Sequence, residues 1–241
     1  MKPTLIITHL PDRAVGIVRD ALRAAGCEVI ERNPADAQKL PAAAEVAGIV
    51  ALGGRQSATR AADDPFLATE VELLAAGLEL KVPILGMCLG AQLLAVAAGG
   101  LVSYTGTMNA GWPEMTLLPE AAGDPLFGAF PARLPVLKWH EDIIALPPGA
   151  IELATTPGPG AALFRVGDCA WGSQAHLELT EPMLIEGWTV DPGDIAEIEG
   201  AGHRIEEFRA ASRGHLVAQM AAARPMFTAF GRLTTSSPSF A

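Results

Sequence analysis

Cys88 has the sequence surroundings of a nucleophile. It stands in Gly86-Met87-Cys88-Leu89-Gly90, between an apolar run that predicts a buried strand and another that predicts a helix. This is the G-x-nucleophile-x-G pattern with cysteine in place of serine. Glycine at both flanks lets the strand and the helix pass closely, and the start of a helix favours the thiolate form of a sulfur placed there. We therefore predict that Cys88 is a nucleophile.

The alternative for a free cysteine is a place in the core, which is where most of them lie. For Cys27 and Cys169, which stand in strand-like segments without flanking glycines, we prefer that structural interpretation. Three cysteines without a close pair, and an N-terminus without a signal-peptide pattern, predict a reducing, cytoplasmic location.

A cysteine nucleophile needs a base, and the base needs a group that orients it. Among the five histidines, His176 has a carboxylate two residues later, Glu178, at the end of a strand-like run. Residues two apart on a strand share a face, about 7 Å apart along the chain, so this carboxylate can hold the imidazole. Such pairs also arise by chance on solvated strands. The histidines without such a neighbour are expected to be structural or exposed: His9, His203 and His215.

The elements that must position these residues alternate along the first half of the chain. We expect strands at 4–8, 27–31, 48–52 and 82–87, and helices after Asp12 as a cap, at 64–76 and at 89–98. This alternation predicts a parallel sheet with helices on both faces. In such a sheet chemistry gathers at the carboxyl ends of the strands, which is where Gly53-Gly54 and Cys88 fall.

The second half of the chain predicts short strands that continue the sheet in mixed or antiparallel fashion. We expect them at 115–118, 135–139, 143–146, 151–155, 161–166 and 170–175, followed by helices at 194–198 and 205–230. We predict one domain over residues 1–233 and a disordered tail, rich in serine and threonine, over residues 234–241.

Composition excludes several classes of protein. The chain has 241 residues, half of them hydrophobic, which is enough to form a core without disulfides or a structural metal and excludes a disordered chain. Its net charge of −10, without clustered lysine and arginine, argues against nucleic-acid binding.

One stretch has the length of a membrane span. No charged residue lies between Lys81 and Glu114, and residues 82–102 are strongly apolar, which meets the threshold of about 20 residues for a transmembrane helix. Pro83 at its start and the glycines within it argue against the continuous helix that a bilayer requires. We therefore predict that the uncharged run forms the buried strand and helix on either side of Cys88.

Four segments, in this order, resemble the class I glutamine amidotransferases, and in particular stand-alone proteins similar to the glutaminase domain of GMP synthase. They are LGG at 52–54, VPILGMCLGAQLLA at 82–95, WHED at 139–142 and GSQAHLE at 172–178. The resemblance implies a single-domain α/β fold with a flavodoxin-like open sheet. That sheet would be mostly parallel with an antiparallel extension, and helices would cover both faces.

The resemblance also implies a reaction. Cys88 would attack the γ-amide of glutamine, His176 would move the proton, and Glu178 would orient His176. The backbone N–H groups of Gly54 and Leu89 would form the oxyanion hole. A glutamyl thioester would then be hydrolysed to glutamate, and ammonia would pass to an unknown acceptor, activated by a separate synthetase or ligase. No cofactor, metal, nucleic acid or membrane is implied.

Further residues are implied in substrate binding. Gln92, one helical turn after Cys88, is the family's usual contact to glutamine. His140 and Asp142 lie in the block that often meets the amino-acid end of the substrate, although each alone is equally typical of a polar surface turn. Arg55 stands where the family usually has proline. Its charge can reach an anionic group, which leaves open a substrate other than free glutamine.

Three alternatives remain open. The same triad would serve a stand-alone γ-glutamyl peptidase or hydrolase. A cysteine α/β-hydrolase has the same elbow, but its acid precedes the histidine, so Asp142 or Asp168 would partner His176 or His203; Glu178 argues against this. A non-catalytic binding module on the amidotransferase scaffold is the third alternative, and the intact triad argues against it.

Overall fold

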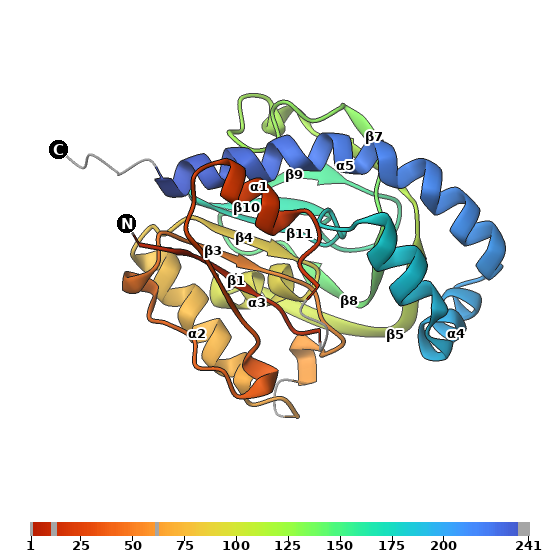
Figure 1. The fold of residues 1–241 in the computed structure, drawn as a ribbon, viewed down its shortest axis with the longest axis horizontal. Helices are drawn as coiled ribbons and strands as arrows, with labels where there is room; N and C mark the ends of the chain where they lie inside the picture. The colour runs from red at the N-terminus through yellow and green to blue at the C-terminus, as the bar shows by residue number, and fades with distance from the viewer. Residues whose placement is uncertain (1, 11–13, 61–62, 236–241) are drawn as a thin grey trace.

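The computed structural model describes residues 2–10, 14–60 and 63–235, and it forms a layered α/β structure around a nine-stranded sheet (Figure 1). The sheet begins with five parallel strands, in the order β2 (Val29–Arg32), β1 (Thr4–Ile7), β3 (Gly48–Ala51), β4 (Ile84–Met87) and β11 (Ala170–Ser173). It continues with antiparallel pairings through β10 (Leu163–Val166), β9 (Ile151–Thr155), β6 (Glu114–Leu117) and β7 (Arg133–Pro135). The predicted fold, a parallel sheet with an antiparallel extension, is confirmed.

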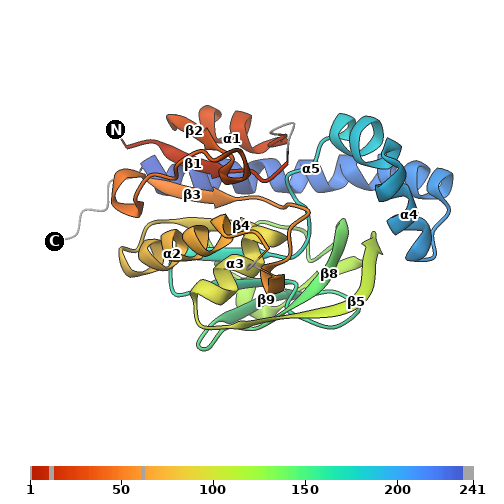
Figure 2. The same cartoon turned by 90° about the horizontal axis from the view of Figure 1, so that it is seen from below.

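Alternating side chains of the central strands supply two cores, one on each face of the sheet. On β1, Leu5 and Ile7 belong to the cluster under α2 (Phe66–Glu79) and α3 (Leu89–Ala97). Ile6 points the other way, into the cluster under α1 (Val18–Ala24) and α5 (Ile205–Thr235). Figure 2 shows α1 and α5 on one side of the sheet and α2 and α3 on the other. The cause is the two-residue period of a strand, which sends neighbouring side chains to opposite faces.

The ends of several elements differ from the prediction. Helix α1 begins at Val18, and the cap predicted at Asp12 lies outside the described residues. Helix α5 continues through Thr235, so two residues of the predicted tail are helical, and residues 236–241 lie outside the described part. Short 3₁₀ turns lie in connections of the first half of the chain, at Pro34–Asp36, Ala43–Glu45, Ala58–Arg60 and Pro119–Ala121.

A two-stranded sheet, which the sequence interpretation missed, stands beside the main one. It pairs β5 (Leu101–Gly111) with β8 (Lys138–Ala145) in antiparallel fashion. The prediction that the whole uncharged run is a buried strand and helix is therefore wrong for its second part, because Leu101 and Tyr104 are 71% and 53% exposed. This part lacks charge but carries serine, threonine and asparagine, which water solvates well. Within the described residues, no helix has the length and apolar character needed to cross a membrane.

The chain between β11 and α5 lies beyond the carboxyl ends of the parallel strands. It contains a π-helical turn (Pro182–Gly187), a 3₁₀ turn (Trp188–Val190) and α4 (Pro192–Gly200). Helix α4 packs against β5 and the first part of α5, as Figure 1 shows. These elements add a wall at the edge of the sheet where Cys88 lies.

Candidate active site

Cys88 occupies a sharp turn between β4 and α3. Its φ of 48° and ψ of −108° lie in a region that side chains other than glycine rarely adopt. A Cβ atom at Gly86 would lie 2.6 Å from the backbone of Gly90, and one at Gly90 would lie 2.1 Å from the carbonyl oxygen of Ala51. The close approach predicted for the two flanking glycines is therefore confirmed.

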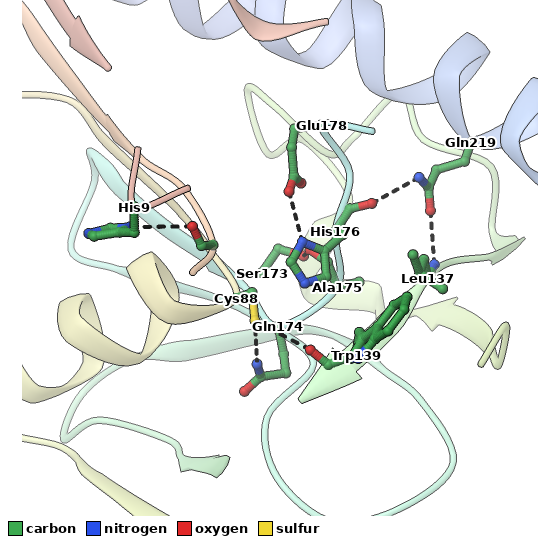
Figure 3. Close-up of polar contacts among 11 residues, drawn as sticks. His9, Cys88, Leu137, Trp139, Ser173, Gln174, Ala175, His176, Glu178 and Gln219 are labelled. Carbon is green, nitrogen blue, oxygen red and sulfur yellow. Dashed lines mark hydrogen bonds and ion pairs between the residues drawn. The ribbon is translucent and has the colours of Figure 1, made fainter. Parts of the chain in front are cut away.

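The sulfur of Cys88 lies in a buried, polar environment (Figure 3). The side-chain amide of Gln174 lies 3.8 Å from Sγ and donates to it, and Sγ lies 3.8 Å from the carbonyl oxygen of Trp139. The backbone N–H of Cys88 donates to the carbonyl of Ser173 at 2.7 Å, which ties the turn to the end of β11. The sulfur is thus held at the N-terminus of α3.

His176 and Glu178 form a buried pair beside the sulfur. Nδ1 of His176 lies 2.8 Å from Oε1 of Glu178, and both side chains are about 95% buried. Because a carboxylate only accepts, Nδ1 donates and the second ring nitrogen remains for Cys88. Burial lowers the pKa of His176, but the negative charges and hydrogen bonds of Cys88 and Glu178 outweigh it and raise that pKa well above its usual value. The Trp188 ring packs against the imidazole in a T-shaped arrangement at a centroid distance of 5.0 Å.

Gln219 on α5 holds the backbone of His176, and the sequence interpretation missed it. Its amide nitrogen donates to the carbonyl of His176 at 2.9 Å, and its amide oxygen accepts from the N–H of Leu137 at 3.0 Å (Figure 3). Gln219 is completely buried, on the same helix face as Leu216 and Ala223. In a sequence, the signal for such a buried side chain that hydrogen-bonds the backbone is a long polar residue within the apolar face of a helix.

Two backbone N–H groups belong to residues that line the same cavity as Cys88. Gly53 and Gly54 follow β3, and Leu89 is the first residue of α3, whose N–H has no partner inside the helix. Within the described residues, neither the N–H of Gly54 nor that of Leu89 makes a hydrogen bond. Two free donors beside a sulfur are the arrangement that stabilises an oxyanion.

One cavity of about 170 Å³ is lined by all nine residues that the sequence marks as candidates. They come from elements far apart in the chain: Gly54, Arg55, Cys88, Leu89, Gln92, His140, Asp142, His176 and Glu178. The structure therefore brings the four sequence segments together at one edge of the sheet. Within the described residues, no group of three or more histidine, cysteine, aspartate or glutamate side chains is arranged to hold a metal ion.

His140 and Asp142 project from β8 into this cavity and are buried. Nδ1 of His140 donates to the carbonyl of Asp142 at 2.8 Å, which leaves Nε2 as an acceptor that has no partner among the described residues. Burial, and then the positive charge of Lys138, lower the pKa of His140 to about 3, so the ring is neutral. One oxygen of Asp142 accepts from the hydroxyl of Ser57 at 2.6 Å, and its second oxygen, Oδ1, has no partner in the part of the chain that the structure describes. The cavity thus contains unsatisfied acceptors.

Arg55 forms an ion pair at the edge of the cavity. Its guanidinium group lies 2.6 Å from the carboxylate of Asp194 on α4. The contact joins the loop after β3 to α4 across the edge of the cavity. A second contact ends on the same helix, from the indole N–H of Trp139 to Glu197 at 2.6 Å. The role of Arg55 toward an anionic substrate, expected from the sequence, stays a prediction, because an ion pair that is more than half exposed on the arginine side is weak.

The family model for class-I glutamine amidotransferases matches residues 12–182, which is most of the chain. The chain belongs to the class-I glutamine amidotransferase family. Its matching segment includes the turn at Cys88, the loop at Gly54 and the pair of His176 and Glu178.

The match to curated relatives covers only part of each relative's length. The chain is 29% identical, over 58% of its length, to the glutamine amidotransferase-like protein YfeJ of Salmonella typhimurium, of which the match covers 60%. It is 30% identical, over 80% of its length, to a glutamine-hydrolyzing GMP synthase of Aeropyrum pernix, of which the match covers 38%. The chain therefore spans less than two thirds of the length of these relatives.

Solved structures of amidotransferases share the fold along nearly the whole chain. A glutamine amidotransferase from Thermotoga maritima has a TM-score of 0.83 at 24% identity, and the match covers 97% of this chain and 98% of the other. One from Methylobacillus flagellatus has a TM-score of 0.82 at 25% identity, with 97% and 94% covered. The α/β-hydrolase alternative is accordingly wrong, and His203 bonds to the carbonyl of Ala110 rather than to an acid.

Proposed function

We propose that this protein hydrolyses the γ-amide of a glutamine-type substrate through a thioester on Cys88. The observation that carries the proposal is the convergence of a strained cysteine, a histidine–carboxylate pair and two free backbone N–H groups on one cavity. Acyl transfer requires a nucleophile, a group that carries protons and donors for the oxyanion. The cysteine, the histidine–carboxylate pair and the two N–H groups supply these in turn.

In the first step the thiolate of Cys88 attacks the γ-carbonyl carbon, and the C=O electron pair moves onto oxygen. The N–H groups of Gly54 and Leu89 donate to that oxyanion. His176, protonated and held by Glu178, gives its proton to the departing nitrogen, so that the C–N bond breaks and ammonia leaves. The product on the protein is a γ-glutamyl thioester.

In the second step water completes the reaction. The neutral His176 takes a proton from a water molecule, whose oxygen attacks the thioester carbon. Collapse of the second tetrahedral intermediate breaks the C–S bond and returns the thiolate of Cys88 beside an imidazolium. Glutamine and water thereby give glutamate and ammonia, with no other reactant consumed.

Substrate selection falls to the other residues of the cavity. Asp142 presents an unpartnered carboxylate oxygen, which suits the α-ammonium group of a free amino acid. The neutral His140 adds an acceptor beside it, and Gln92 lines the cavity one turn after the nucleophile. These groups favour a substrate with an unblocked α-amino group.

Ammonia would be consumed by an acceptor that a synthetase or ligase domain or chain activates. The glutamine-hydrolyzing GMP synthases among the curated relatives support this partner class. If no such partner exists, the same chemistry makes the protein a γ-glutamyl peptidase.

The test is glutamate and ammonia release from glutamine, with a γ-glutamyl dipeptide as the second substrate. We expect release from glutamine by the wild type and a loss of at least about 10³-fold in Cys88→Ala, because the nucleophile is removed. Cys27→Ala, which replaces a buried cysteine outside the cavity, is the matched control and should keep full activity. Full activity of Cys88→Ala would eliminate the amidase and the peptidase alike. No turnover of either substrate by the wild type would favour a binding module.

A further inference from the structure

His9 and Glu70 form a completely buried pair behind the loop that follows β3. Nε2 of His9 lies 2.7 Å from Oε2 of Glu70, and neither side chain is exposed to solvent. His9 follows β1 and Glu70 lies on α2, so the pair joins two elements beneath the loop. The sequence interpretation treated His9 as structural or exposed, and the proposed chemistry does not use it.

The second nitrogen of the ring contacts the loop itself. Nδ1 of His9 lies 3.3 Å from the carbonyl oxygen of Gly53 (Figure 3). A carboxylate and a carbonyl oxygen both only accept, so both ring nitrogens carry protons and His9 is an imidazolium. Burial alone lowers the pKa of His9, but the charge and hydrogen bond of Glu70, followed by the carbonyl groups of Gly53 and Leu52, raise it above its usual value.

A fixed carbonyl fixes the rest of its peptide. The bond between Gly53 and Gly54 is trans, as are all the peptide bonds described, so its N–H points away from its carbonyl. The carbonyl points to His9, and the N–H belongs to Gly54, which lines the cavity with Cys88. Glycine has broad conformational freedom on both sides of this peptide. Without the contact to His9 the peptide can rotate, and the N–H of Gly54 then no longer points at the oxyanion.

Space at the loop supports the same arrangement. A Cβ atom at Gly54 would lie 2.6 Å from Cβ of His9, while one at Gly53 would lie 2.7 Å from Cε1 of His176. The loop therefore lies between His176, which faces Gly53, and His9, which faces Gly54. A chain of small residues fits between them, and among the described residues it is His9 whose side chain donates to the carbonyl of Gly53.

We propose that His9, held by Glu70, is a positioning residue that fixes the peptide between Gly53 and Gly54 with its N–H directed at the oxyanion. The role rests on the proposed function, because an oxyanion forms only if Cys88 attacks an amide. His9 itself does not touch the substrate and acts through the peptide. Glu70 supplies the charge that keeps both ring nitrogens protonated.

The kinetic test compares His9→Phe, which keeps a ring beside Phe66 but has no donor, with His9→Asn, which keeps a donor near the position of Nδ1. Loss of one oxyanion donor costs about 10²–10³-fold in kcat. We expect a loss of that order in His9→Phe, with KM within about twofold of the wild type, and a loss at least about 10-fold smaller in His9→Asn. Equal losses in the two variants, or an unchanged kcat in His9→Phe, would overturn the proposal.

Two probes separate positioning from general damage. The aldehyde analogue of glutamine adds to Cys88 and creates an oxyanion, whereas iodoacetamide alkylates the sulfur without one. His9→Phe should bind the aldehyde less tightly by the factor lost in kcat/KM and should react with iodoacetamide within about twofold of the wild type. Equal loss with both probes would show a merely structural role. Arg165→Gln, which breaks the buried ion pair with Asp124 outside the cavity, is the control and should keep both reactions.

A structural measurement keeps the proposal testable if the wild type proves inactive. A crystal structure of His9→Phe should show the peptide between Gly53 and Gly54 rotated, with its carbonyl turned from the wild-type direction. An unchanged orientation overturns the positioning role. His9→Leu replaces His9→Phe in every arm if the latter does not fold, because it also removes the donor to Gly53 and has a smaller side chain. Inactivity of the wild type by itself counts against the proposed function, not against the position of the peptide.

Discussion

Gly53 lies directly against His176, since a Cβ atom added at residue 53 would come within 2.7 Å of Cε1 of the imidazole and 3.5 Å of Cβ of Cys88. The loop after β3 and the histidine after β11 therefore share a contact that permits no side chain. Any atom added at Gly53 must move either the loop or the imidazole. In the proposed reaction the loop donates to the oxyanion and the imidazole transfers the proton.

Gly53→Ala should consequently lose activity without unfolding. The φ of Gly53 lies outside the left-handed region, so alanine meets a steric conflict rather than backbone strain. A displacement of about 1 Å in a reacting group can cost about 10²-fold, and we expect a fall in kcat of that order. Gly214→Ala, in open space on α5, is the control. It should keep its activity and gain about 0.5–1 kcal/mol of stability, measured by urea unfolding. Equal kcat in both variants would contradict the prediction.

The protonation of His176 should depend on Cys88. Because the charge of Cys88 helps to raise the pKa of His176, Cys88→Ala should lower that pKa, measured by NMR titration of the imidazole Cε1 proton. Ser173→Ala, which removes a hydroxyl bonded to Ala175, is the control and should leave the pKa unchanged. A pKa of His176 that does not respond to Cys88→Ala would show that the two side chains are not coupled.

The same coupling predicts how stability changes with pH. A raised pKa in the folded state means that the native protein binds a proton more tightly than the unfolded chain. This contribution is complete below the usual value of 6.5 and is lost as pH rises through the raised pKa of the folded state. Glu178→Gln should reduce that loss, measured as a smaller fall of Tm with increasing pH. Parallel Tm curves for the wild type and Glu178→Gln would refute the assignment.

The backbone strain at Cys88 should make the glycine variant more stable than the alanine variant, which is the reverse of the usual order. In an ordinary helix or strand, glycine is less stable than alanine by about 0.5–1 kcal/mol. At a φ of 48°, alanine retains the strain and glycine does not, and such strain is worth about 1–3 kcal/mol. Cys88→Gly should therefore be more stable than Cys88→Ala by about 1 kcal/mol in urea unfolding. The opposite order would mean that the turn is not strained.

Gln219→Leu tests the two hydrogen bonds that Gln219 on α5 makes to the backbone of Leu137 and His176. It leaves the N–H of Leu137 and the carbonyl of His176 buried without partners, and each such group costs about 1–3 kcal/mol. We expect lower stability together with a lower kcat, because the backbone of His176 is released. Gln38→Leu, at a partly exposed position that does not line the cavity, is the comparison and should change kcat by less than twofold. Activity that is retained despite the lost stability would limit Gln219 to a structural role.

The contact between Arg55 and Asp194 should matter little for folding. The arginine is more than half exposed, and such ion pairs contribute about 0–1 kcal/mol after screening by solvent. Arg55→Gln should leave Tm nearly unchanged and alter KM for glutamine, because the loop loses its tie to α4 at the edge of the cavity. Arg133→Gln, in an exposed pair with Glu114, is the control. Equal KM values in the two variants would show that this tie plays no part in binding.

Local patterns were sufficient for the elements around the nucleophile. The apolar runs before and after Cys88, and the glycines between them, predict a strand, a tight turn and a helix because each depends on residues within about one turn of one another. The pair of His176 and Glu178 is predictable for the same reason, since its two members stand two residues apart. The exposed strand β5 was missed because an uncharged stretch of serine, threonine and glycine has no clear apolar period.

By itself, the sequence determined the chemistry that the chain can carry: one cysteine in a glycine frame, one histidine with its carboxylate, and an amidotransferase order of segments. Only the tertiary structure decided what surrounds them. It placed Gln219 behind His176, His9 and Glu70 behind the loop at Gly53, and Asp194 on Arg55. These partners are 43 to 139 residues apart, and a hydrogen bond between distant residues leaves no period or spacing in a sequence. The fold brings them together because parallel strands end at one edge of a sheet, where burial then requires each polar group to find a partner.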